Sequence, residues 1–148
     1  LVLMHWIERD LTHLNELVHV VSEVTGEPIP DNYPVFGRDA FRTATGVHAA
    51  ALVKAFHKND PELMDAVYSG VPAWFVGRTQ EIEVGPMSGK SNVVFWLERR
   101  GIAPDEYLVD RLFRRAKASS TVLTEGEMLA EIQDARTQLS TRRTSEAL

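Results

Sequence analysis

No cysteine occurs among the 148 residues of the chain. This excludes a disulfide framework and a thiolate metal site, and it fits the reducing cytoplasm, where we expect the protein to reside. No apolar run approaches the ~20 residues of a transmembrane helix, so no membrane partner is expected. Excess positive charge is missing as well: the formal net charge is -5, with 16 lysines and arginines scattered along the chain. Nucleic acid is therefore not an expected partner.

Apolar residues recur at three- and four-residue steps through most of the chain, which predicts a mainly helical protein. Helices are expected over residues 12–25, from Gly46 to about Phe56, from Asp60 to near Tyr68, from Ser88 or Ser91 to Gly101, from Pro104 to about Ala116, and from Thr124 through Ile132. In the second of these, Val47, Ala50, Ala51 and Ala55 are expected to face inward. No alternation of strands and helices appears, which excludes a complete α/β barrel and a nucleotide-binding sheet.

Three segments do not fit this helical pattern. Residues 27–37 carry Pro28, Pro30 and Pro34, which predicts an extended, stiff connector and a boundary between folded parts. Residues 80–84 alternate weakly between polar and apolar side chains, which indicates a short strand. From residue 138 onward the chain is polar, and a frayed tail is expected there.

The segment Gly85–Ser91, with sequence GPMSGKS, invites comparison with a phosphate-binding P-loop. That loop needs four residues between its first glycine and the Gly-Lys-Ser, whereas only three stand here. The preferred interpretation is a helix N-terminus whose small residues allow close packing. An anion contact at this N-terminus, helped by Lys90, is the alternative.

The histidines lie at positions 5, 13, 19, 48 and 57, and none pairs with another at metal-binding spacing on a helix. His48 differs from the others because it falls in the first turn of an expected helix, beside small residues, where a neutral imidazole can accept a proton. From the residues alone, a structural role for His48 remains the preferred interpretation. Tyr68 is interpreted as a core-edge residue, and Glu81 and Glu83 as a solvated face rather than a carboxylate pair.

Several short motifs, in order, resemble one enzyme family. Asn32–His48 (NYPVFGRDAFRTATGVH) resembles the segment that joins the barrel to the C-terminal region in 2-isopropylmalate synthases and the related citramalate and homocitrate synthases. Gly77-Arg78, followed by Ser88–Val93 (SGKSNV), resembles the second helical subdomain of the same enzymes. The resemblance covers roughly residues 1–135.

This resemblance implies a mainly α fold class: the last strand and helix of a TIM barrel, then a Pro-rich linker and small helical C-terminal subdomains. The implied organisation is the end of the barrel at 1–26, the linker at 27–37, helical subdomain I at 38–76, helical subdomain II at 77–137 and a disordered tail at 138–148. A TIM barrel takes ~250 residues, so the catalytic barrel itself is missing from this chain. Its divalent-metal ligands are expected to be missing with it.

The resemblance also implies an activity: acetyl-CoA is condensed with a 2-oxo acid, and the 2-isopropylmalate synthase reaction of leucine biosynthesis is the first expectation. Thr45–His48 matches a family pattern whose histidine, with a tyrosine matched by Tyr68, completes the active site of the partner barrel in a homodimer. Ala49 and Ala50 stand where many relatives have Gln-Asp, which leaves the substrate open.

Two alternatives remain beside this expectation: a homocitrate or citramalate synthase fragment, and a non-catalytic dimerisation or interaction module. The chain alone is expected to have no synthase activity. It is also expected to self-associate, because residues 1–26 would expose a face made for the barrel.

Overall fold

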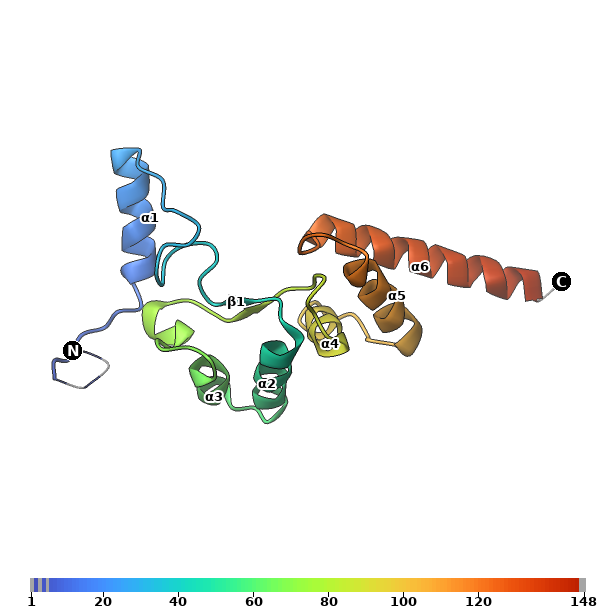
Figure 1. Cartoon of the computed structure of the whole chain (residues 1–148), viewed down its shortest axis with the longest axis horizontal. Helices are drawn as coiled ribbons and strands as arrows, with labels where there is room; N and C mark the ends of the chain where they lie inside the picture. Colours follow the sequence, from blue (N-terminus) through green and yellow to red (C-terminus); the bar gives the residue numbers. More distant parts are fainter. Residues whose placement is uncertain (1, 3, 5, 147–148) are drawn as a thin grey trace. The chain divides into compact units, whose positions relative to one another are not determined.

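The computed structural model describes residues 2, 4 and 6–146, and this part of the chain is mainly helical (Figure 1). In chain order the elements are α1 Leu14–Thr25, β1 Arg42–Thr43, α2 Gly46–His57, α3 Pro61–Ala66, the 3-10 helix η1 Ala73–Val76, β2 Glu81–Ile82, α4 Lys90–Glu98, α5 Glu106–Lys117 and α6 Glu125–Glu146. β1 and β2 pair in a two-stranded sheet. No helix in this described part is long and apolar enough to cross a membrane.

The chain forms two compact units that alternate along the sequence. Unit 1 contains Leu1–Thr43 and Ala51–Glu81, and unit 2 contains Ala44–Ala50 and Ile82–Leu148. These limits differ from the expected organisation, in which the Pro-rich segment separates two parts. That segment instead lies inside unit 1, and the first turn of α2 belongs with the residues that follow β2.

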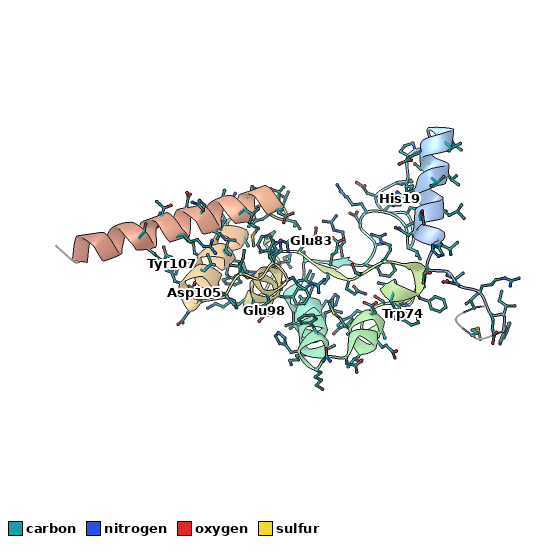
Figure 2. The ribbon with its side chains drawn as sticks, turned by 180° about the vertical axis from the view of Figure 1, so that it is seen from behind. His19, Trp74, Glu83, Glu98, Asp105 and Tyr107 are labelled. Carbon is teal, nitrogen blue, oxygen red and sulfur yellow. The ribbon has the colours of Figure 1, made fainter. Side chains whose placement is uncertain are left out.

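The core of unit 2 lies between α4, α5 and α6, which contact one another in sequence order. Leu97, Leu112 and Met128, one from each helix, are fully buried. α5 begins where the sequence predicts, because the carboxylate of Asp105 accepts a hydrogen bond from the amide of Leu108 at 2.9 Å (Figure 2). The three- and four-residue periodicity of the sequence therefore identified this core correctly.

α6 is longer than expected. Its start is the predicted capping box, in which Thr124 and Glu127 exchange hydrogen bonds with each other's backbone amides at 2.8 and 3.2 Å. The helix continues to Glu146, so residues 138–146, expected to be a disordered tail, are helical. Neither glycine nor proline occurs after Gly126, and nothing in the local sequence interrupts the backbone hydrogen bonds.

The prediction of which α2 residues face inward is partly wrong. Ala49, Leu52 and Val53 are buried, as is the predicted Ala55. Val47 is 75% exposed although it was expected to face inward. Residues 49, 52 and 53 define one face at the helical period, and a residue two positions before Ala49 lies on the opposite side.

In unit 1, α1 ends as predicted at Gly26, which adopts the left-handed conformation with φ of 72°. The expected barrel strand before α1 is not found in residues 2, 4 and 6–13, and residues 1, 3 and 5 lie outside the described part. A strand of a parallel barrel depends on hydrogen bonds to neighbouring strands, and the strands of the described residues are only the two short ones, β1 and β2.

The Pro-rich segment is a folded loop rather than the expected extended connector. Backbone amides of Tyr33, Gly37 and Asp39 donate to carbonyls within the loop at 2.9 Å each. Gly37 allows this compactness, since a Cβ at that position would lie 2.3 Å from the carbonyl oxygen of Asp31. The prolines restrict the chain locally but leave the turns between them free to close.

Arg78 holds this loop in place. Its Nη1 donates hydrogen bonds to the carbonyls of Val35 at 2.9 Å and Gly37 at 2.8 Å. Its guanidinium also lies 5.4 Å from the centre of the Phe41 ring. The Gly-Arg motif of the sequence therefore has a structural role, which is to fix the Pro-rich loop within unit 1.

Candidate functional site

His48 lies in the first turn of α2, within unit 2, and is exposed. The turn begins with two backbone hydrogen bonds: the amide of Gly46 donates to the carbonyl of Met87, and that of Ala49 to the carbonyl of Thr45, both at 3.0 Å. The imidazole is therefore presented from an ordered helix start on an accessible surface. This is the placement that a residue acting on an external substrate needs.

Two buried polar side chains bind the backbone just before this turn. Ser88 is 2% exposed and Asn92 is fully buried. The hydroxyl of Ser88 lies 2.7 Å from the carbonyl oxygen of Ala44, and the amide nitrogen of Asn92 lies 3.4 Å from the same oxygen. Asn92 also donates to the carbonyl of Glu83 at 2.9 Å. We call Ser88, Asn92 and the Ala44 carbonyl the α4 clamp.

Two glycines bring the starts of α2 and α4 into contact beside the clamp. A Cβ added to Gly46 would lie 2.7 Å from the backbone nitrogen of Gly89, closer than real Cβ atoms approach. Gly89 is the N-cap of α4, and its amide donates to the side-chain oxygen of Asn92 at 3.0 Å. The preferred interpretation of the GPMSGKS segment, small residues at a helix start for close packing, is consistent with this contact.

The alternative interpretation, an anion contact helped by Lys90, is not supported by the ion pairing. Lys90 pairs with Asp110 of α5. The Lys90 hydrogen bond holds the pKa of Asp110 below its usual range. The amide of Gly85 donates to the Ser88 hydroxyl at 2.8 Å, so the loop closes around its own serine.

Tyr68 lies in unit 1, two residues after the end of α3, and is 62% exposed. Its φ of 65° places it in the left-handed region, which a tyrosine rarely adopts. The neighbouring Ser69 accepts a hydrogen bond from the side chain of Gln80 at 2.8 Å. Val35, Phe41 and Asn59 adopt the same conformation, so the backbone alone does not single out Tyr68; its phenol is exposed rather than at the edge of the core.

The segment after Tyr68 is fixed to α3 by a buried carboxylate. Asp65 is 8% exposed and accepts a hydrogen bond at 2.9 Å from the backbone amide of Trp74 in η1. Trp74 is labelled in Figure 2. Burial raises the pKa of Asp65, and the hydrogen bond from Trp74 opposes that effect without cancelling it. Asp65 and Trp74 therefore hold both ends of the short loop that carries Tyr68.

The structure gives no support to a carboxylate pair at Glu81 and Glu83. Glu81 pairs with Arg42 at 3.5 Å, and Glu83 is partly buried, with its backbone carbonyl held by Asn92 (Figure 2). Among residues 2, 4 and 6–146, no group of three or more His, Asp or Glu side chains is placed to hold a metal ion. The divalent metal that the resemblance implies does not fit these residues, and we assign no step of the chemistry to it.

Reasoning from the sequence missed Ser88 and Asn92 as structural determinants of the His48 turn. The sequence carries a weak signal for them: Ser88 directly precedes Gly89, and Asn92 stands immediately before the apolar run of α4 at residues 93–97. A polar residue at a position that the helical period buries indicates hydrogen bonds made elsewhere in the fold.

The sequence is similar to known synthases over most of its length. It is 32% identical over 127 residues to a homocitrate synthase of Pyrococcus horikoshii, a match that covers 86% of this chain and 32% of that protein. It is 34% identical over 101 residues to an (R)-citramalate synthase of Aquifex aeolicus, covering 66% of this chain and 17% of that protein. The chain belongs to the family of homocitrate, citramalate and 2-isopropylmalate synthases.

A probable 2-isopropylmalate synthase of Archaeoglobus fulgidus is also similar, at 28% identity over 105 residues, with 71% of this chain and 20% of that protein covered. The chain spans about a third or less of the length of these relatives. No family model matches it. The family predicted from the motifs is therefore confirmed, whereas the particular synthase is not determined.

Proposed function

We propose that this chain is part of a synthase that condenses acetyl-CoA with a 2-oxo acid, and that His48 and Tyr68 complete the active site of a partner subunit. The observation that carries the proposal is the exposed His48 in the ordered first turn of α2, in a chain of this family. Tyr68 adds a second exposed polar group, which the chain holds in a strained backbone conformation.

The proposed chemistry begins with loss of a proton from the methyl group of the acetyl thioester. A neutral imidazole at His48 accepts that proton, and the resulting enolate forms a bond to the ketone carbon of the 2-oxo acid. The π electrons of the ketone pass to its oxygen, and the alkoxide so formed takes up a proton. In this proposal the Tyr68 phenol hydrogen-bonds the substrates. Because His48 is exposed in this chain, the exclusion of water that favours enolate formation is assigned to the partner barrel.

One face of α1 supports the view that the chain works within a larger protein. Leu17, Val20, Val21 and Val24 recur at helical spacing, and each is about half exposed or more, up to 81% for Val24. An apolar stripe of this kind indicates a helix made to pack against further protein.

The proposal is tested in a chimaera in which this chain replaces the matching region of the P. horikoshii homocitrate synthase. We expect His48→Ala to lower kcat by about 10²–10⁴-fold, the usual contribution of a general base. His19→Ala is the matched control because His19 is an exposed histidine on α1 (Figure 2). Equal turnover of the two variants would overturn the role of His48.

Action on the partner subunit is tested by mixing. Subunits with His48→Ala are combined with subunits whose barrel metal ligands have been replaced. If His48 acts across the dimer, the mixture regains a fraction of the turnover that neither parent has. If it acts within its own subunit, the mixture stays as inactive as its parents.

The particular 2-oxo acid is a finer question, because the barrel is expected to select it. We keep 2-isopropylmalate synthesis as the first candidate, with homocitrate and citramalate synthesis beside it.

Sequencing the DNA immediately upstream of Leu1 tests the proposal at the gene level. A barrel encoded in frame supports the synthase and supplies the enzyme for a panel of 2-oxo acids. A stop codon there favours the non-catalytic interaction module.

A further inference from the structure

We propose that Ser88 and Asn92 are positioning residues for His48, and that they act through the carbonyl of Ala44. The proposal rests on the proposed function of His48 and adds a specific mechanical role for α4. Every residue involved lies in unit 2.

The first step concerns the path from the clamp to the imidazole. The carbonyl of Ala44 is bound by both clamp side chains, and the amide of Gly46 is bound by the carbonyl of Met87. Residues 44–46, which lead into α2 and include its first residue, are therefore anchored at both ends to α4 and the loop that precedes it. His48 follows within the same helical turn, so its backbone position is set by these bonds.

The second step concerns why the clamp residues are polar although they are buried. A buried polar side chain is unfavourable unless its hydrogen bonds are satisfied. The side-chain oxygen of Asn92 accepts from the amide of Gly89, and its nitrogen donates to the carbonyls of Glu83 and Ala44. Apolar side chains at positions 88 and 92 would need no hydrogen-bond partners, but they could not fix both the direction and the distance of the Ala44 carbonyl.

The third step concerns what a looser turn would do. Misplacement of a reacting group by about 1 Å can lower a rate by about a hundredfold. The contact between Gly46 and Gly89 leaves no space for a side chain, so the turn sits directly on α4. A substitution that weakens the clamp or separates the two glycines should therefore move His48 without removing it.

The first readout is an NMR measurement on the full 148-residue chain. The variants are Ser88→Ala, Asn92→Asp and Gly46→Ala. Asp at position 92 keeps an acceptor for Gly89 and loses both donors, and Ala at position 46 tests the geometry while removing no polar group. We expect each variant to shift or broaden the ring resonances of His48, while those of His19 stay unchanged.

Two controls separate positioning from general loss of stability. Gly126→Ala changes a glycine in α6 that has nothing within 4 Å of the added carbon. Met128→Ala removes a fully buried side chain from the same unit without touching the clamp. Both controls should leave the His48 resonances in place. If Met128→Ala moves them as far as Ser88→Ala does, or if no clamp variant moves them, positioning is overturned. Should Asn92→Asp fail to fold, Gly46→Ala answers the same question.

The second readout is turnover in the chimaera. We expect the clamp variants to lower kcat by about ten- to a hundredfold, with KM for acetyl-CoA nearly unchanged. If an added stabilising substitution elsewhere in unit 2 leaves the lowered turnover of the clamp variants unchanged, positioning is supported; if it restores turnover, the loss came from stability and positioning is overturned. If His48→Ala leaves turnover unchanged, the proposed function fails while the NMR result still decides the positioning. If His48→Ala abolishes turnover and the clamp variants do not lower it, the positioning alone fails.

Discussion

The carboxylate of Asp65 accepts a hydrogen bond from the backbone amide of Trp74 at 2.9 Å and thereby joins α3 to η1. Asp65→Ala leaves that amide without its partner, and we expect a loss of about 1–3 kcal/mol in the free energy of unfolding. Urea titration measures this change. Glu62→Ala, in the exposed first turn of the same helix, should change stability little. A similar loss from both substitutions would contradict the role of the Asp65 bond.

Asp65 also predicts a pH dependence. Burial raises the pKa of Asp65 in the folded state above that in the unfolded state. The contribution of Asp65 to the free energy of unfolding is therefore complete below the unfolded-state pKa and is lost as pH rises through the folded-state pKa. Asp65→Asn keeps an acceptor for Trp74 and removes the titration. We therefore expect the stability of the asparagine variant, relative to the natural chain, to increase as pH rises from about 3 to 7 in urea titrations. A constant difference across that range would show that burial does not govern this carboxyl.

Arg78 is predicted to be irreplaceable by lysine. A lysine ammonium cannot reproduce the planar contact with Phe41 together with the two hydrogen bonds to Val35 and Gly37. We expect Arg78→Lys to lower the free energy of unfolding by about 1–3 kcal/mol and to raise hydrogen exchange in the Pro-rich loop. Arg99→Lys, at the exposed end of α4, provides the control. Unchanged exchange in the loop would mean that its own turns suffice to hold it.

The capping box of α6 predicts the opposite pH trend to that of Asp65. Hydrogen bonds from the amide and hydroxyl of Thr124 lower the pKa of Glu127. Its contribution is therefore present above the unfolded pKa and lost as pH falls through the folded pKa. Glu127→Gln should reduce the pH dependence of the free energy of unfolding between about pH 3 and 5. Thr124→Ala should lower the free energy of unfolding by about 0.5–2 kcal/mol at neutral pH. Circular dichroism during urea titration measures both effects; identical acid slopes in the natural and Glu127→Gln chains would refute the first.

The apolar stripe on α1 predicts self-association of the isolated chain. Val21→Lys together with Val24→Lys places two charges on the exposed face and should shift the chain toward monomer, because apolar patches drive association. Light scattering over a concentration series measures the mass. Glu16→Lys with Glu23→Lys introduces the same two lysines at exposed positions of α1 that are already charged, leaves the apolar stripe intact, and should leave association unchanged. A natural chain that stays monomeric at every concentration would contradict the prediction.

Local chemistry made several elements predictable. Asp60, Asp105 and Thr124 cap their helices where the sequence placed them, since an N-cap depends only on residues within one turn. The clamp was not predictable in the same way. The Ser88 hydroxyl and the Ala44 carbonyl are 44 residues apart, and backbone carbonyls carry no side-chain signature. The compact Pro-rich loop escaped prediction for the same reason, because Arg78 lies 43 residues beyond Val35.

The same sequence separation orders the folding of unit 2. α4, α5 and α6 follow one another in the chain and contact their sequence neighbours, so their packing closes only short loops. The hydrogen bond from Ser88 to Ala44 closes a loop of 44 residues, and this closure loses more chain entropy than the short loops between the helices do. We therefore expect the three helices to assemble first and the His48 turn to dock last. Loss of the Ser88 hydroxyl should then accelerate unfolding in stopped-flow measurements while leaving the refolding rate almost unaltered.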